Sequence, residues 1–293
     1  MNILGVFYII LSSMAFSVVG IFVKPLLADN NSLSMILISR FLLTLIILIP
    51  FINYQHMLKR QNLYEVFFGG LFYFLTTVFY ISAVPYIGVG LATILAFIFP
   101  IYIFIFSIIR REIKFSYSNL SIIILSLIGL ILLSSNKIYT FDSMIGFLYA
   151  LSCGVLYATY IYFNKKNSAT SKLNVLYFQL IGASFYSFLL TFFNTPKLNF
   201  NLNFIINISL LSFIGTFICL FFLIKSIEKI GPFNTSILSL SEPIFAVIFS
   251  YIFIQEKINF SQFCGLSLIV FSCFLAIYLP MKKQKMESQK EIN

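Results

Sequence analysis

Long stretches without a charged residue dominate the sequence and limit the folds that the chain can adopt. Of its 293 residues, 60% are hydrophobic and 10% are charged, a balance that the surface of a water-soluble domain does not carry. About 20 apolar residues in a helix cross the roughly 30 Å hydrocarbon core of a bilayer. Residues 122–125 do not alternate polar and apolar side chains as a β-barrel wall does, so the sequence predicts membrane-spanning helices.

The apolar stretches define ten expected spans. Eight contain no charge, and two contain one each: Arg40 in the second and Glu242 in the ninth. Residues 66–109 are too many for one helix and are divided at Pro85, because proline disfavours helix at the preceding residue. The expected spans are residues 3–23, 33–52, 66–85, 86–109, 115–136, 143–164, 173–196, 198–224, 230–255 and 258–281.

The basic residues predict how these spans are oriented. Lys and Arg accumulate in the loops on the cytoplasmic side of a membrane. With both termini in the cytoplasm, 14 of the 19 Lys and Arg residues fall in cytoplasmic segments, and only Lys24, Lys137, Lys197 and Lys257 fall outside. The net charge of +10 is thus explained by topology, and we expect a multi-pass protein of the inner (plasma) membrane without a nucleic-acid partner.

Two matching passages predict an internal repeat. Gly88 corresponds to Gly231, and Pro100 to Pro243, both at an offset of 143 residues. Each unit holds five spans, so the second unit enters the membrane from the opposite side, and such inverted repeats support alternating access to a site at the bilayer midplane. The expected units are residues 1–136 and 143–281, followed by a short basic cytoplasmic tail, residues 282–293.

Motifs in both halves resemble those of a known family. They are residues 14–17 with Lys24, residues 40–41, residues 83–88, Pro100, Glu112, residues 241–246 and Glu256. In this order the sequence resembles the drug/metabolite transporter superfamily, and specifically its bacterial EamA-type members, over residues 4–134 and 145–279. The resemblance implies an all-α membrane protein with ten helices in two inverted five-helix repeats. It also implies a carrier or exporter of small organic molecules, often amino acids and related metabolites.

Glu242 is the first candidate for function. It lies near the middle of residues 230–255, where a charge costs about 2.5–3.5 kcal/mol on insertion scales, so we expect it to face the interior of the bundle. We interpret it as a contact for a substrate ammonium group or as the site of a coupling proton. The alternative is a polar side chain that only joins neighbouring helices.

Arg40 is the second candidate. Its guanidinium is suited to bidentate binding of a substrate carboxylate, but it is equally suited to reaching the headgroups or free backbone carbonyls. Together Arg40 and Glu242 would complement a zwitterion, or they would pair with each other.

Pro100 and Pro243 are expected to interrupt the fourth and ninth helices at corresponding places. Matching interruptions in two repeats point to a transport site, although kinks needed only for curvature are the alternative. Gly88 and Gly231 mark the entrances of the same two helices and are expected to act as hinges.

Further substrate-binding candidates are polar or aromatic residues expected at mid-depth. They are Ser17, Tyr73, Tyr80, Tyr157, Tyr160, Thr216 and Ser239. The alternative for each tyrosine is packing or interfacial anchoring, because the sequence contains no Trp to serve at the interface.

The sequence contains no catalytic Ser/His/Asp set, no phosphate-binding glycine loop and no HExxH motif, and its four cysteines have no metal-ligand spacing. An enzyme, a cofactor and a metal are therefore not expected. We expect a secondary transporter, and specifically an exporter of amino-acid-like or drug-like metabolites, that works by alternating access. Its partners would be a small-molecule substrate, the lipid bilayer and a coupling proton; monomer and homodimer stay open. The alternatives are a membrane-embedded lipid-handling enzyme and a non-transporting membrane scaffold.

Overall fold

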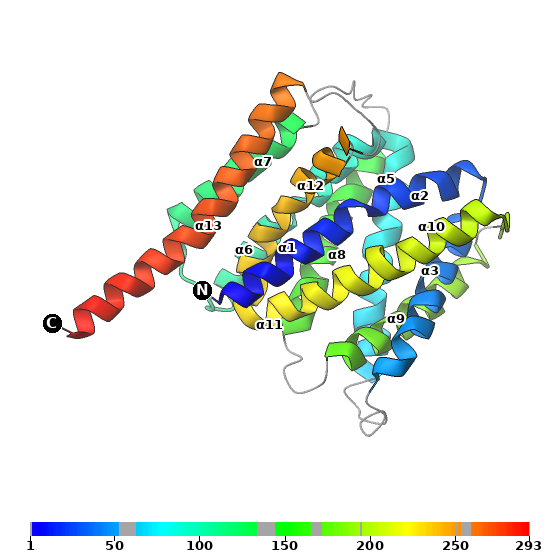
Figure 1. Ribbon diagram of the computed structural model, residues 1–293, viewed down its shortest axis with the longest axis horizontal. Coiled ribbons are helices and arrows are strands. Elements are labelled where there is room, and N and C mark those ends of the chain that lie inside the picture. The colour runs from blue at the N-terminus through cyan, green and yellow to red at the C-terminus, as the bar shows by residue number, and fades with distance from the viewer. Residues whose placement is uncertain are drawn as a thin grey trace.

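The protein is helical throughout the part that the structure describes (Figure 1). This computed structural model describes residues 2–52, 63–133, 144–165, 172–193, 195–249, 251–252 and 259–292, and no strand occurs among them. The helices are α1 (Ile3–Ser17), α2 (Val19–Ala28), α3 (Leu33–Leu48), η1 (Ile49–Phe51), η3 (Glu65–Gly69), α5 (Gly70–Ala96), α6 (Phe99–Ile109), α7 (Tyr117–Leu133), α8 (Met144–Lys165), α9 (Lys172–Leu190), α10 (Leu202–Ser212), η4 (Phe213–Ile218), α11 (Cys219–Leu238), η5 (Ser239–Ser241), α12 (Glu242–Phe249) and α13 (Phe260–Ile292).

Eight helical stretches in the described ranges are long and apolar enough to cross a membrane. They are Ile3–Ala28, Leu33–Phe51, Glu65–Ile87, Leu91–Ile109, Met144–Lys165, Lys172–Leu190, Leu202–Phe249 and Phe260–Leu279, and Tyr117–Leu133 is a shorter apolar helix. The expectation of an all-helical membrane protein is confirmed. The count of ten spans and the cytoplasmic position of both termini stay predictions.

The stretch Leu202–Phe249 contains 48 residues, which is about 72 Å of helix and more than twice the thickness of the hydrocarbon core. Gly231 divides it, because its backbone has φ 78° and ψ 166°, a conformation that is essentially restricted to glycine. A Cβ at this position would have open space around it, so the backbone conformation alone calls for glycine here. This break lies one residue inside the expected span of residues 230–255, and the boundary with residues 198–224 stays a prediction.

The chain also reverses direction within α5. The Tyr80 hydroxyl and Thr93 Oγ1 are 2.9 Å apart, although 13 residues of straight helix would separate their backbones by about 20 Å. This contact supports the expected division of residues 66–109, and its position at Pro85 stays a prediction.

Both expected proline interruptions are present. α5 ends at Ala96 and α6 begins at Phe99, so Pro100 lies in the first turn of a new helix. In the second half, the 3-10 turn η5 ends at Ser241 and Pro243 lies in the first turn of α12. Proline is tolerated in the first turn because the N–H that it lacks has no partner within the helix there.

Glycines allow several helices to cross at close range. A Cβ on Gly129 of α7 would lie 2.8 Å from the Gly265 carbonyl of α13, and a Cβ on Gly70 would lie 2.7 Å from the Gly182 Cα of α9. Small residues serve this purpose in membrane helices. α7 and α13 lie side by side along one edge of the molecule, and α13 continues to Ile292, past the expected end of the last span at residue 281 (Figure 1).

Candidate functional site

A row of aromatic rings crosses the interior from α5 through α8 to α6. The ring centroids of Tyr73 and Tyr160 are 5.5 Å apart, those of Tyr160 and Tyr157 are 6.4 Å apart, and those of Tyr157 and Phe99 are 4.7 Å apart. Tyr160 and Phe99 are buried, whereas Tyr157 keeps some accessible surface. Phe99 begins α6, so the row ends at the interrupted helix of the first half.

Glu242 is the first residue of α12, at the interruption in the second half. The positive end of a helix dipole favours a carboxylate in the first turn. Protein atoms enclose its side chain, which nevertheless keeps some accessible surface. Tyr80 and Tyr157 lie within range of its charge. Within the described part of the chain, no hydrogen bond or ion pair reaches the Glu242 carboxylate.

Two serine hydroxyls, on η5 and on the helix α1 that packs against it, also lack partners. Ser13 Oγ and Ser241 Oγ are buried and receive or donate no hydrogen bond among the described residues. Ser241 immediately precedes Glu242, and Ser13 lies on α1, the helix that packs against η5 and α12. A buried hydroxyl without a partner is costly, so this part of the interior offers unused hydrogen-bonding capacity.

Arg40 is held by the protein itself. Its Nε donates to Thr216 Oγ1 at 2.5 Å, and its Nη2 donates to the Gly215 carbonyl at 2.6 Å and to the Tyr73 hydroxyl at 3.2 Å. A guanidinium binds a carboxylate bidentately through the Nε/Nη2 edge or the Nη1/Nη2 edge. Both edges need a hydrogen on Nη2, and both of those hydrogens are in use.

The irregular helix η4 provides two of the three partners of Arg40. η4 is a π-helix, in which hydrogen bonds close over five residues instead of four, and it includes both Gly215 and Thr216. Just before it, Ser212 Oγ lies 2.7 Å from the Ile208 carbonyl and 3.0 Å from the Arg40 carbonyl. Thr44 Oγ1 likewise lies 2.8 Å from the Arg40 carbonyl and 3.1 Å from the Ser212 carbonyl. α3 is therefore fixed against the second half through both backbone and side chain.

Arg40 and Glu242 form no ion pair with each other; the two ion pairs among the described residues are Glu112–Lys165 and Glu228–Lys172. The charges of both Arg40 and Glu242 act on the Cys219 thiol, which is buried at the start of α11. The two charged residues thus lie in the same interior region, within range of Cys219, and have different surroundings.

The remaining expected residues are near helix breaks. Ser17 ends α1 and donates to the Met14 carbonyl at 2.7 Å, just before the break at Val18. Ser239 begins η5 and donates to the Ser236 carbonyl at 2.8 Å. Gly88 lies within the helical range of α5, where its surroundings are not described. The structure thus gathers Tyr73, Tyr80, Tyr157, Tyr160, Thr216, Arg40 and Glu242 in the interior, whereas Ser17 and Ser239 bond to their own helices.

A buried polar network was missed by the sequence reasoning. Gln179 Nε2 donates to Glu65 Oε2 at 2.7 Å and to Asn164 Oδ1 at 2.9 Å, and Gln179 Oε1 accepts from the Tyr160 hydroxyl at 2.9 Å. All four side chains are buried. Glu65 precedes the expected span of residues 66–85 by one position and so falls outside it. Gln179 carries no charge that would distinguish it within its apolar span.

Gln179 and Arg40 occupy matching places in the two halves. Arg40 is the eighth residue of α3 and Gln179 is the eighth residue of α9. Each donates to a π-helix of the other half: Arg40 to η4, and Gln179 to Glu65, the first residue of η3. A polar residue at the same depth of the corresponding span was the sequence signal that would have identified Gln179.

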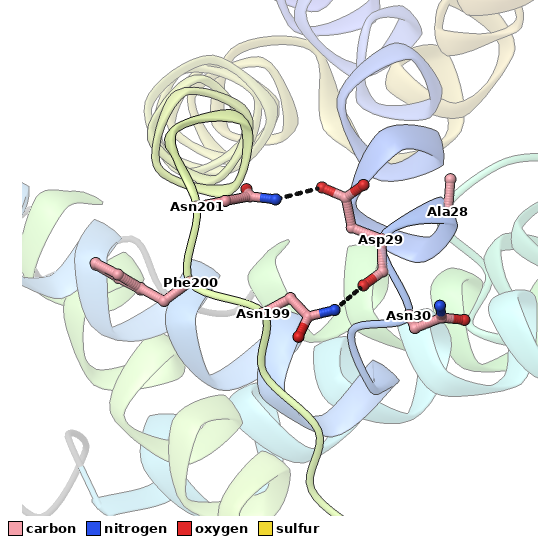
Figure 2. Close-up of a pocket in the computed structure, with 6 residues that line it drawn as sticks. All are labelled: Ala28, Asp29, Asn30, Asn199, Phe200 and Asn201. Atoms are coloured by element: carbon pink, nitrogen blue, oxygen red, sulfur yellow. Dashed lines mark hydrogen bonds between the residues drawn. The ribbon is translucent and has the colours of Figure 1, made fainter.

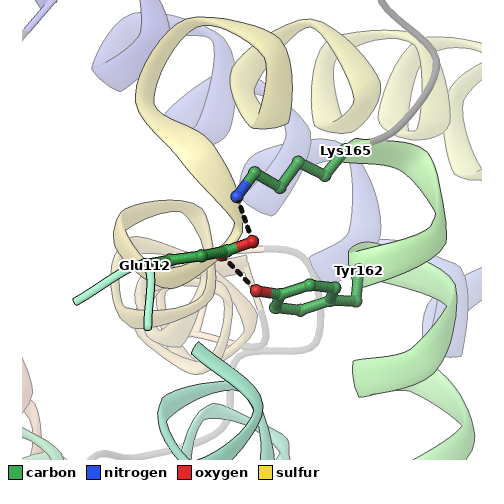
Figure 3. Close-up of polar contacts among 3 residues, drawn as sticks. All are labelled: Glu112, Tyr162 and Lys165. Carbon is green, nitrogen blue, oxygen red and sulfur yellow. Dashed lines mark hydrogen bonds and ion pairs between the residues drawn. The ribbon is translucent and has the colours of Figure 1, made fainter. Parts of the chain in front are cut away.

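A polar contact also joins the halves near the end of α8 (Figure 3). Glu112, in the loop between α6 and α7, accepts from the Tyr162 hydroxyl and pairs with Lys165 Nζ at 2.6 Å. Burial of the Glu112 carboxyl alone would raise its pKa, but the hydrogen bonds from Lys165 and Tyr162, with the charges of Lys165 and Arg110, hold the pKa below its ordinary value.

A second contact between the halves joins the loop after α2 to the segment before α10 (Figure 2). Asn199 Nδ2 donates to the Asp29 carbonyl at 2.6 Å, Asn201 Nδ2 donates to Asp29 Oδ2 at 3.1 Å, and the Ser32 N–H donates to the Lys197 carbonyl at 2.9 Å. A pocket of about 490 Å³ lies here, lined by Ala28, Asp29, Asn30, Asn199, Phe200 and Asn201. It includes none of the expected site residues, so we place the candidate site in the interior around Glu242 instead.

Comparison with known proteins bears on both halves. The EamA-like transporter family matches residues 3–135 and 144–278. No curated protein matches the chain. Among solved structures, 29 chains match; one, described as "Crystal structure of protein", is 14% identical with a TM-score of 0.81, covering 96% of this chain and 99% of that chain. At this identity the likeness concerns the fold alone. The family match spans nearly the whole sequence, and the protein is therefore a membrane protein that belongs to the EamA-like transporter family.

Proposed function

We propose that the protein is a secondary transporter that moves small organic solutes, amino-acid-like or drug-like, across the membrane by alternating access. The observation that carries this proposal is the match of one transporter family to both halves of the chain. Such a repeat gives two conformations of comparable energy around a shared site. Export from the cytoplasm is the proposed direction, and the plasma (inner) membrane is the proposed location.

The proposed topology has ten spans in two inverted units, residues 1–136 and 143–281, with residues 282–293 as a cytoplasmic tail. Contacts between segments that this topology assigns to one side support it. Glu112 pairs with Lys165, and Glu228 with Lys172, on the proposed cytoplasmic side. The Ser32–Lys197 backbone bond lies on the proposed outer side.

In this proposal Glu242 binds substrate or a coupling proton, because it is an enclosed carboxylate at an interrupted helix. Tyr80 and Tyr157 contribute the neighbouring wall. Gly88 and Gly231 act as hinges beside the interruptions at Pro100 and Pro243. Arg40, Ser17, Tyr160, Thr216 and Ser239 stay candidates for substrate contact. The driving force would be a proton or solute gradient.

A transport assay in vesicles tests the proposal. Metabolites retained by cells with and without the protein would first be compared to find solutes, which are then loaded into vesicles that hold the purified full-length chain. We expect labelled solute to exchange faster than in protein-free vesicles. Gly231→Ala, which forces a strained backbone costing about 1–3 kcal/mol, should slow exchange.

Gly20→Ala is the matched control for that variant, because nothing lies within 4 Å of a Cβ at Gly20 and its φ is ordinary. Exchange no faster than in protein-free vesicles, for every solute that the cell comparison identifies, would contradict a transport function.

A further inference from the structure

We propose that the site around Glu242 binds the cationic end of a solute, a protonated amine attached to an aromatic or apolar body, and discriminates against solutes that carry a carboxylate. The inference rests on the proposed function and narrows its substrate class. It is carried by the groups that line the interior at the two helix interruptions.

The first feature of the site is the Glu242 carboxylate. Glu242 is enclosed by protein at the start of α12, keeps some accessible surface, and has no hydrogen-bond or ion-pair partner in the described part of the chain. A carboxylate in such a place favours a positively charged hydrogen-bond donor. An ammonium group supplies three such donors.

The second feature is a group of aromatic rings within range of the Glu242 charge. The charge of Glu242 acts on Tyr80 and Tyr157, both of which keep some accessible surface. Tyr157 packs against Phe99 with centroids 4.7 Å apart, and Phe99 lies 5.8 Å from Phe97, which is also partly accessible. The faces of aromatic rings attract cations, so carboxylate and rings favour the same charge.

The third feature is Arg40, the residue whose guanidinium is suited to bind a solute carboxylate. Both of its bidentate edges pass through Nη2, whose hydrogens bind the Gly215 carbonyl and the Tyr73 hydroxyl. Its side chain is buried, at 4% exposure. A solute carboxylate would therefore find no bidentate partner here, and it would be repelled by Glu242 as well.

The fourth feature is the pair of serine hydroxyls, of Ser13 and Ser241, that have no hydrogen-bond partner among the described residues. Ser241 Oγ lies next to Glu242 in the chain, and Ser13 Oγ lies on the helix that packs against α12. Each hydroxyl has two acceptor lone pairs. They add free hydrogen-bond acceptors to the elements that carry and contact Glu242, which suits a group with several N–H donors.

Three probes with the same aromatic body separate the charge types. They are 2-phenylethylamine, a cation; L-phenylalanine, a zwitterion; and 3-phenylpropanoate, an anion. Equilibrium binding to the purified full-length protein in lipid nanodiscs would be measured by calorimetry at pH 7. We expect the affinity for the amine to be at least about tenfold higher than the affinity for either of the other two probes. Only the amine adds a charge-assisted bond without also adding a carboxylate.

Variants then connect this preference with the proposed residue. Glu242→Gln should weaken amine binding by about tenfold or more, whereas Glu242→Asp, which keeps the charge, should retain part of it. Glu228→Gln is the matched control, because this carboxylate is exposed and pairs only loosely with Lys172 at 3.8 Å. Size-exclusion chromatography and circular dichroism check that each variant is folded.

The inference is overturned if phenylalanine or phenylpropanoate binds as tightly as the amine, if none of the probes binds, or if folded Glu242→Gln binds the amine normally. Should Glu242→Gln fail to fold, the order of the probes in the unchanged protein decides. Failure of the transport proposal is separate: amine binding without any solute exchange in vesicles would contradict transport, whereas exchange of carboxylate-bearing solutes alone would contradict only the cation preference.

Discussion

Arg40 joins α3 to α5 of its own half and to η4 of the second half through donors that have fixed directions. The planar guanidinium reaches Thr216, the Gly215 carbonyl and Tyr73 at once. A lysine ammonium at this position would not reach all three groups, and each buried group left without a partner costs about 1–3 kcal/mol. We expect Arg40→Lys to lower the unfolding temperature of the purified protein.

The control for this substitution is Lys24→Arg, because Lys24 is exposed and its change should leave the unfolding temperature unaltered. Equal unfolding temperatures for Arg40→Lys and the unchanged protein would show that the hydrogen bonds around Arg40 contribute nothing to stability.

Glu112 predicts how stability depends on pH. Its pKa lies below the ordinary value because of Lys165 and Tyr162, so its contribution is fully present above the unfolded pKa of about 4.3. The contribution is lost as the pH falls through the folded pKa. The unfolding temperature of the unchanged protein should exceed that of Glu112→Gln between pH 6 and 8, and the difference should shrink as the pH falls below the unfolded pKa of about 4.3 and through the folded pKa. A constant difference down to pH 3 would contradict this assignment.

At the scale of elements, α9 depends on Gly182 for its approach to η3. A Cβ there would collide with the Val66 carbonyl, which is backbone and has no freedom to rotate away. Gly182→Ala should therefore separate the two helices and displace Gln179 from Glu65. We expect a loss of about 1–3 kcal/mol or more of stability, typical of overpacking, measured by thermal unfolding.

Gly20→Ala again supplies the comparison, because alanine at this open helical position should be neutral or slightly stabilising. If the two variants unfold alike, the close crossing of α9 and η3 is not required.

The sequence predicted the helix interruptions well because proline leaves an unambiguous signal. Pro100 and Pro243 both lie in the first turn of a new helix, at the expected interruptions. The π-helices η3 and η4 were not predicted, because one additional residue in an apolar stretch changes neither composition nor charge. Arg40 and Glu242 were found because a charge within a span is conspicuous, whereas the partners of Arg40 depend on which helices meet.

At the scale of the whole molecule, hydropathy does not predict which helices pack against each other. α1 packs against α11, and α3 packs against α9, so each half contacts the other through several helices. In a membrane every face of a span is apolar, and the period of hydrophobic residues does not mark the inner face. Because every face of a span is apolar, the sequence shows where the apolar stretches are but does not show which of them pack together.

The orientation in the membrane is testable with single cysteines. Lys197 is exposed in the segment before α10, and Lys229 is exposed on α11. In intact cells we expect a membrane-impermeant maleimide to label Lys197→Cys directly and Lys229→Cys only after lysis, because basic loops stay in the cytoplasm. The unchanged chain gives the background from its own cysteines. The opposite pattern would place the termini outside.

The two π-helices have a consequence for how the sequence varies. A π-helical turn holds one residue more than an α-helical turn, and each residue turns a helix by about 100°. A single-codon insertion in a span can thus be absorbed by one wider turn, so that the residues beyond it keep their direction. η4 includes Thr216, so a one-codon deletion there would preserve the span and move Thr216 relative to the guanidinium of Arg40. Alignments of the two halves should therefore allow gaps inside the membrane, at these two turns, as well as in the loops.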